Sequence, residues 1–200
     1  MNTEIETAEV FATPLWMSRL PLFETHKDNL INLCNEIREN DPKGVVYSNE
    51  NGYQSVSFAG DNRFIPLFEK IAEMVRTAIN DCKFIESEII IDHCWVNYNE
   101  APNAMNVEHV HGGVFSGVFY LHVPPESGEL YLRNPGLNPM WKGSMMPREK
   151  ANKLTKLFEI MTPVEGNIYL WASHVPHFVV PNRHNDGRIS ISFNVDLKPI

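Results

Sequence analysis

Residues 106–111 contain two histidines that are separated by one residue. In a β-strand, residues i and i+2 face the same side, so His109 and His111 can direct two imidazole rings toward one point, while Glu108 and Val110 face away. Imidazole nitrogens bind iron, zinc, copper and nickel. Two histidines at this spacing are more often structural, but the pair is a candidate for two ligands of a metal ion.

A third ligand must come from a distant part of the chain. His174 and His177 both lie in the segment 171–177, and either of them can complete the set. Three ligands on one side of a metal ion leave other coordination positions open for a substrate or for oxygen. The residues alone do not decide between these two histidines.

Polar and apolar residues alternate from 188 to 195, which is typical of an antiparallel strand with one face in water. Because this segment begins shortly after His177, its polar face can instead line the inside of a barrel. The guanidinium of Arg188 offers a fork of donors that matches a carboxylate, and the hydroxyl of Ser190 lies on the same side. The pattern therefore predicts a carboxylate-binding pair close to the histidine-rich site.

The rest of the chain supplies elements that can position these residues. Hydrophobic periodicity predicts helices at 25–40 and 62–82, and a third, short helix at 150–161. Turn residues separate a series of expected strands, at 84–99, 114–123, 129–133, 167–171, 177–180 and 188–197. Two helices followed by many short strands predict an α+β domain, with a sandwich or open barrel and helices that cover one sheet.

Composition excludes several classes of protein. The 200 residues are 43% hydrophobic, which is enough for a core, and the formal charge of −8 argues against a dedicated nucleic-acid binder. No apolar run is long enough to span a membrane, and residues 1–10 lack the basic start of a secretory signal. The 3 cysteines lack metal-site or disulfide spacing, so we expect free thiols and a cytoplasmic protein.

Blocks of sequence along nearly the whole chain resemble the Fe(II)- and 2-oxoglutarate-dependent oxygenases, and among them a small branch found in phage and bacterial genomes. The most specific blocks are Ser116-Gly-Val-Phe-Tyr-Leu121, Trp171-Ala-Ser-His-Val-Pro-His177 and Arg188-Ile-Ser-Ile-Ser-Phe-Asn194. The others lie at 11–16, 48–49, 52–55, 95–97 and 109–111. The resemblance implies a double-stranded β-helix, or jelly roll, in a single domain over 1–200, with helical support at 1–83 and the jelly-roll core at 84–200.

The resemblance also implies an iron site formed by His109, His111 and His177. His111 stands where the family usually has a carboxylate, so three neutral imidazoles would leave the Fe(II) site one unit more positive. Glu108 could supply a carboxylate only if a β-bulge reversed the local phase of the strand. His174 is the rival for the distal position, but the family pattern favours His177.

The cosubstrate 2-oxoglutarate would lie next to this iron. The resemblance implies that Arg188 binds its distal carboxylate, with Ser190 beside it. Tyr120 matches a tyrosine whose hydroxyl binds this carboxylate in prolyl-hydroxylase relatives, although it could equally be a packed core residue. Asn97 and Asn99 are weaker candidates for the lining of the pocket.

The activity implied is hydroxylation of a peptide, protein or small molecule, with release of succinate and CO2. Residues 48–61 and 136–159 would shape the substrate pocket, or the second segment could be a solvated connector. One alternative is a cupin-like metalloprotein that does not use 2-oxoglutarate, and another is a structural module without catalysis. A homodimer is the commonest assembly of soluble oligomers.

Overall fold

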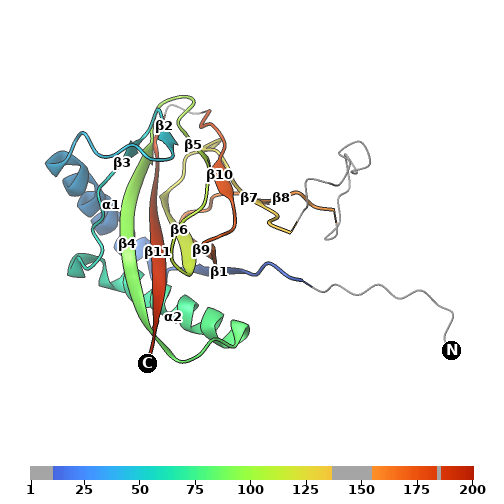
Figure 1. The fold of residues 1–200 in the computed structure, drawn as a ribbon. Coiled ribbons are helices and arrows are strands. Elements are labelled where there is room, and N and C mark those ends of the chain that lie inside the picture. The colour runs from blue at the N-terminus through green and yellow to red at the C-terminus, as the bar shows by residue number, and fades with distance from the viewer. Residues whose placement is uncertain (1–10, 137–154, 184–185) are drawn as a thin grey trace, which may run out of the picture.

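The computed structural model describes residues 11–136, 155–183 and 186–200, which form two antiparallel β-sheets and two long helices (Figure 1). The first sheet has six strands in the order β1 (Leu15–Arg19), β9 (Asn167–Ala172), β6 (Phe115–His122), β11 (Arg188–Pro199), β4 (Ser87–Asn99) and β3 (Tyr53–Gln54). The second sheet has five strands in the order β2 (Asn49–Glu50), β5 (Met105–His109), β10 (His177–Val179), β7 (Leu130–Arg133) and β8 (Phe158–Met161).

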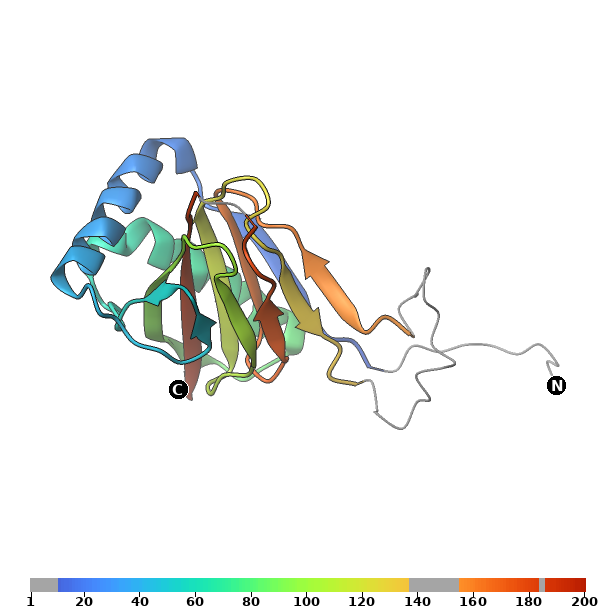
Figure 2. The ribbon, with the colours of Figure 1, turned by 90° about the horizontal axis from the view of Figure 1, so that it is seen from above.

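Both long helices cover the outer face of the first sheet, while the second sheet lies on its other side (Figure 2). They are α1 (Phe23–Asn40) and α2 (Ile65–Cys82), and a short 3-10 turn, η1 (Asn62–Phe64), precedes α2. Their apolar residues recur at helical spacing, so each helix presents one buried face to the sheet. The two helices predicted from the sequence are confirmed.

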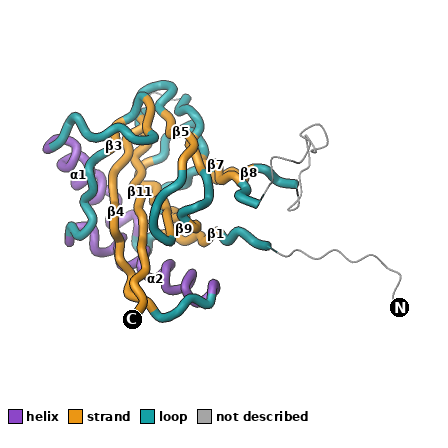
Figure 3. The backbone as a smooth tube through the Cα atoms, viewed as in Figure 1, coloured by secondary structure: helices purple, strands orange, loops and turns teal. Residues whose placement is uncertain are grey.

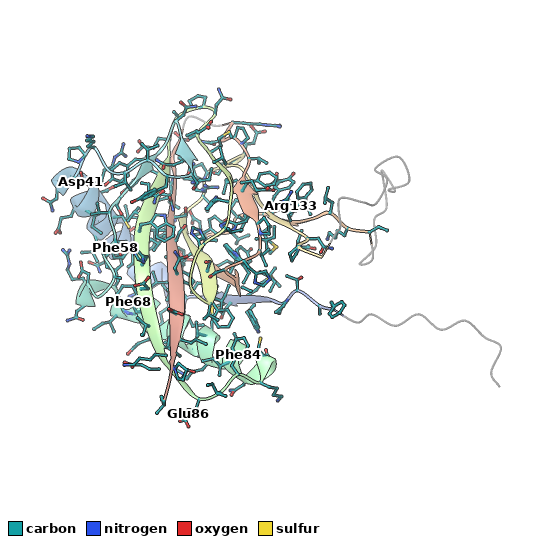
Figure 4. The ribbon with its side chains drawn as sticks, in the orientation of Figure 1. Asp41, Phe58, Phe68, Phe84, Glu86 and Arg133 are labelled. Carbon is teal, nitrogen blue, oxygen red and sulfur yellow. The ribbon has the colours of Figure 1, made fainter. Side chains whose placement is uncertain are left out.

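A large hydrophobic core fills the space between the helices and the first sheet. Ile191 and Phe193 of β11 are buried there, as the alternation of polar and apolar residues predicted. Phe58 and Phe68 stack at 6.4 Å between ring centroids and pack against this core on the helical side of β4 (Figure 4). The helices thereby anchor the first sheet and leave its inner face to the second sheet.

A smaller apolar cluster lies between the two sheets. It consists of Val118, Tyr120, Leu130, Leu132, Tyr169, Trp171 and Val175, together with half-buried neighbours. Because polar residues of β4 and β11 share this inner face, the space between the sheets is mixed in character, with an apolar part and a polar part.

The predicted helix at 150–161 is wrong in its described part. Residues 150–154 lie outside the described residues, and Phe158–Met161 form strand β8, which pairs with β7. The ring of Phe158 packs edge-to-face against Tyr131 and Phe178, with centroids 5.8 and 5.6 Å away. These cross-strand aromatic contacts override a helical pattern that is too short to be stable alone.

The first 83 residues contribute strands as well as helices. Strand β1 pairs with β9 and β3 pairs with β4, whereas β2 joins the second sheet through β5. The segment between α1 and η1, which is mostly loop, therefore bridges both sheets (Figure 3).

The described residues also bear on two expectations from composition. Cys34, Cys82 and Cys94 are all free thiols, and Cys34 and Cys94 are buried. Within the described ranges, no helix has the length and apolar character needed to cross a membrane.

Candidate metal centre

Three histidines from two neighbouring strands meet at the polar part of the space between the sheets. His109 ends β5 and is the direct cross-strand partner of His177, the first residue of β10. His111 follows β5 by two residues, and its backbone N–H donates to the carbonyl of Ser173. One ring nitrogen of each histidine lies within 4.8 Å of the others. The structure thus brings together the three histidines that the resemblance implied as ligands.

Backbone carbonyls fix the orientation of two of these rings. Nδ1 of His109 lies 2.7 Å from the carbonyl oxygen of Val107, and Nδ1 of His177 lies 2.9 Å from that of Val175. Because a carbonyl can only accept, each Nδ1 must carry the hydrogen and donate it. In a neutral imidazole this leaves the lone pair on Nε2, which is free to bind a metal ion.

The surroundings of the three rings keep them neutral. Burial and the neighbouring His109 lower the pKa of His177 to about 3 and that of His111 to about 4. Burial also lowers the pKa of His109, although its bond to the carbonyl of Val107 opposes this shift. Metal ions bind the unprotonated ring, so the cluster is in the metal-binding form at neutral pH.

The two rival ligands lie elsewhere. His174 is exposed in the turn after β9 and is not part of the cluster. Glu108 points away from the histidines and forms an ion pair with Arg133 at 3.1 Å. The β5–β10 register shifts between the pairs His177–His109 and Val179–Asn106, which marks an irregularity in β5. This irregularity does not bring the carboxylate of Glu108 into the site.

Arg188 is buried in the same cavity as the three histidines. Its Nη1 donates to the carbonyl oxygens of Ser127 and Gly128, at 3.1 and 2.9 Å, and its Nη2 donates to Oδ1 of Asn99 at 2.9 Å. Nε is also buried but has no hydrogen-bond partner. Among the described residues, no carboxylate lies within ion-pair distance of this guanidinium, although burial of an unpaired charge is costly.

The other predicted cosubstrate residues surround Arg188. Ser190 lies two residues along β11 and lines the cavity, and Tyr120 of β6 is fully buried with its ring centroid 5.8 Å from the guanidinium carbon. Burial raises the pKa of Tyr120 to about 12, so its hydroxyl remains a donor. Asn97 also lines the cavity, whereas Asn99 contributes indirectly, by holding Arg188.

Several site residues were not found by sequence reasoning. Trp95 and Trp171 line the cavity, with ring centroids 5.6 Å from His111 and 5.0 Å from His177 respectively. Ser127 and Gly128 lie between the expected strands 114–123 and 129–133, and their carbonyls hold Arg188. A Ser-Gly pair between strands gives no sign of what its carbonyls accept.

The donor set fits an iron ion with 2-oxoglutarate. Imidazole suits iron, and three neutral rings with free lone pairs can hold a divalent ion. The orphaned N–H of Arg188 and the hydroxyl of Ser190 give a dicarboxylate two donors in the same cavity. A buried guanidinium without an acidic partner is suited to bind an anionic ligand.

Comparison of the fold with solved structures finds several proteins of similar fold. A prolyl-4-hydroxylase from Pseudomonas putida is 17% identical with a TM-score of 0.59, and the match covers 94% of each chain. A Trichoplax adhaerens prolyl hydroxylase, solved with a hypoxia inducible factor peptide, is 13% identical with a TM-score of 0.57 and coverage of 92% and 83%. HygX from Streptomyces hygroscopicus, solved with nickel, 2-oxoglutarate and hygromycin B, is 10% identical with a TM-score of 0.58 and coverage of 94% and 83%. The predicted double-stranded β-helix is confirmed.

Comparison of the sequence identifies the family. No curated protein matches the chain. The profile of a family described as "Putative 2OG-Fe(II) oxygenase" matches residues 93–194, just over half of the chain. This segment contains the three histidines, Tyr120, Arg188 and Ser190. The chain therefore belongs to the 2OG-Fe(II) oxygenase family, and it is a 2-oxoglutarate-dependent oxygenase with Fe(II) and 2-oxoglutarate as cofactors.

Proposed function

We propose that the protein hydroxylates a C–H bond of a peptide, protein or small molecule, with release of succinate and CO2. The observation that carries this proposal is a buried arginine without an acidic partner in the same cavity as three convergent histidines. Fe(II) in this setting supplies oxidative decarboxylation of 2-oxoglutarate by O2, coupled to transfer of one oxygen atom into the substrate.

His109, His111 and His177 would hold the Fe(II). The carbonyls of Val107 and Val175 keep two of the rings in the tautomer that presents Nε2. Trp171 packs edge-to-face against the ring of His177, which limits its rotation. The protein's part in the reaction is to position these rings before any ligand arrives.

Arg188 would bind the distal carboxylate of 2-oxoglutarate through its free Nε–H. Three bonds to Ser127, Gly128 and Asn99 already fix the plane of the guanidinium, so little side-chain entropy is lost on binding. Ser190 and Tyr120 would add hydroxyl donors, because both line the cavity next to Arg188.

The apolar walls of the cavity would exclude water from the reacting groups. Val118, Leu130 and Val179 line it beside the histidines. Exclusion of water strengthens the polar contacts inside and protects reactive species from side reactions. No side chain is required as a general base in this reaction.

Two loops would shape the entrance for the substrate. Ser48, from the segment 48–61, lines the cavity, and its hydroxyl accepts a hydrogen bond of 3.2 Å from Asn106. The second segment, 136–159, lies largely outside the described residues. The solved relatives include a prolyl hydroxylase in complex with a peptide and HygX with hygromycin B bound, which is why the proposal includes both peptides and small molecules.

We also propose that residues 1–200 form one domain, since strands from the first 83 residues complete both sheets. The free cysteines and the net charge of −8 favour a cytoplasmic protein without a nucleic-acid partner. A homodimer is the assembly to test first.

The decisive experiment measures succinate formed from 2-oxoglutarate without any prime substrate. The purified protein is incubated with Fe(II), ascorbate and O2, and we expect slow, uncoupled succinate formation. It should disappear in an Arg188→Met variant that still binds metal. We also expect 2-oxoglutarate to raise the melting temperature of the metal-loaded protein.

Failure of both measurements would remove the proposal. If the protein binds metal but gives neither succinate nor a thermal shift with 2-oxoglutarate, the cupin-like alternative is correct. If His109→Ala and His177→Ala leave the metal content unchanged, the histidine cluster is not a metal site and the module is structural.

A further inference from the structure

Among the residues that the structure describes, those that line the cavity carry positive charge and no acidic group. None of the described residues that line it is Asp or Glu, and Glu108, the nearest acidic residue in the sequence, pairs with Arg133 outside it. Arg188 is fully buried there without a carboxylate partner. The described part of the chain therefore supplies no negative charge to the lining of this cavity.

A count of charges shows what the loaded site would lack. Fe(II) held by three neutral imidazoles keeps its two positive charges, and Arg188 adds one more. The two carboxylates of 2-oxoglutarate supply only two negative charges, so one positive charge is left uncompensated. An unpaired buried charge is expensive, so an anion that enters this cavity is stabilised strongly.

Two unpartnered polar groups in the cavity are suited to such an anion. Trp171 lines the cavity and is 3% exposed, and its buried indole N–H has no hydrogen-bond partner. Asn97 is 6% exposed, and its Nδ2 donates to Oγ of Ser192 at 3.0 Å, while Oδ1, an acceptor, is buried without a partner. Since the Ser192 hydroxyl can donate or accept, the amide can turn its NH2 to the cavity.

We propose that the prime substrate carries an anionic group, such as a carboxylate, which enters the cavity. This group would accept hydrogen bonds from the indole N–H of Trp171 and from the NH2 of Asn97 once the amide has turned. This inference rests on the proposed function, because it counts 2-oxoglutarate as bound. His111 is the reason that the site needs a further negative charge, since a carboxylate in its place would supply it.

The test uses the full chain loaded with Co(II) and 2-oxoglutarate under anaerobic conditions, so that no turnover occurs. Isothermal titration calorimetry compares acetate with its neutral isostere acetamide. A hydrogen bond to a charged group adds to the charge effect, so we expect acetate to bind at least about 10-fold more tightly than acetamide.

Two variants separate the charge from the hydrogen bond. His111→Asp supplies the missing negative charge and should weaken acetate at least about 10-fold without changing acetamide. Trp171→Phe keeps an aromatic ring beside His177 but removes the indole N–H, and it should weaken acetate binding about 10-fold.

Each other outcome contradicts the inference. Equal affinities for acetate and acetamide, or acetate binding that neither variant weakens, would overturn it while leaving the proposed function intact. If chloride binds as tightly as acetate, the anion that compensates the positive charge is a free halide and not a group of the substrate. If 2-oxoglutarate itself does not bind, the proposed function and this inference both fail.

Discussion

His109 and His177 are direct cross-strand partners in the second sheet, and their ring centroids lie 4.4 Å apart. The register of the β5–β10 pair therefore places two of the three histidines, and His111 needs only to continue from the end of β5. A site built on paired strands is held more rigidly than one built on loops. This relationship leads to the first prediction.

Replacement of His177 by alanine should abolish tight metal binding. The proposed centre loses one of its three ring nitrogens. Mutation of residues that only hold a metal ligand in place already costs about 10–100-fold in metal affinity, so we expect the metal affinity to fall by at least about 100-fold here. The measurement is Ni(II) or Co(II) titration of the folded variant. His174→Ala is the matched control, because His174 is exposed three residues away, and equal losses in both variants would contradict the assignment.

Replacement of Arg188 by lysine should weaken the binding of 2-oxoglutarate and leave the affinity for the metal unchanged. Lysine keeps the charge but cannot reproduce the planar fork that bonds Ser127, Gly128 and Asn99. We expect the Kd for 2-oxoglutarate to rise by about 10–100-fold, the cost of one hydrogen bond to a charged group. Arg183→Lys, at an exposed position, is the control. An unchanged Kd in the Arg188 variant would exclude this residue as the carboxylate partner.

Gly117→Ala should destabilise the fold through overpacking. Gly117 lies in β6, and an added methyl group would collide with the ring of Phe193 and the carbonyl oxygen of Tyr169. We expect a loss of about 1–3 kcal/mol in the free energy of unfolding, measured with urea. Gly112→Ala is the control, since nothing lies within 4 Å of a methyl group there. Equal stability of the two variants would show that β6 can shift to make room.

Glu165 should make stability depend on pH in the acidic range. Burial alone would raise the pKa of its carboxyl, but bonds from Lys27 at 2.6 Å, from the backbone N–H of Val123 at 3.0 Å and from His122 at 3.1 Å lower it. A lowered folded-state pKa means that the stabilisation is complete above the unfolded-state value of about 4.3 and is lost as the pH falls through the folded-state pKa.

Glu165→Gln tests this expectation in urea unfolding at several pH values. At pH 7 we expect the variant to be less stable by about 1–2 kcal/mol, and the difference should shrink as the pH falls below about 4. Glu24→Gln removes an exposed ion pair with Arg19 and should change stability little at any pH. A difference between wild type and Glu165→Gln that is the same at pH 3 and pH 7 would contradict the lowered pKa.

The histidine cluster could be predicted because its signals are local. The spacing of His109 and His111 predicts that both rings face one point, although β5 ends at His109 and His111 lies two residues beyond it. The alternation after Arg188 predicts which residues share its face. The choice of His177 over His174 was not local, and it came from resemblance. In the structure, the turn after β9 leaves His174 exposed, and β10 starts at His177.

Other features depend on contacts between distant segments. Strand β8 was predicted as a helix because its pairing with β7 and its contacts with Phe178 do not show in its own short pattern. The same holds for Trp171, whose importance arises from a ring and an N–H that face residues far away in the chain. Short strands and buried donors are decided by tertiary context.

The bonds from Arg188 to the carbonyls of Ser127 and Gly128 have a consequence for how a ligand is received. These carbonyls belong to a turn that precedes β7, so the guanidinium joins β11 of one sheet to the approach of β7 in the other. The chain's own carbonyls and Asn99 thus hold the guanidinium in place through three hydrogen bonds. Selectivity among diacids should therefore depend on the length that fits between this held guanidinium and the three histidines that would hold the metal.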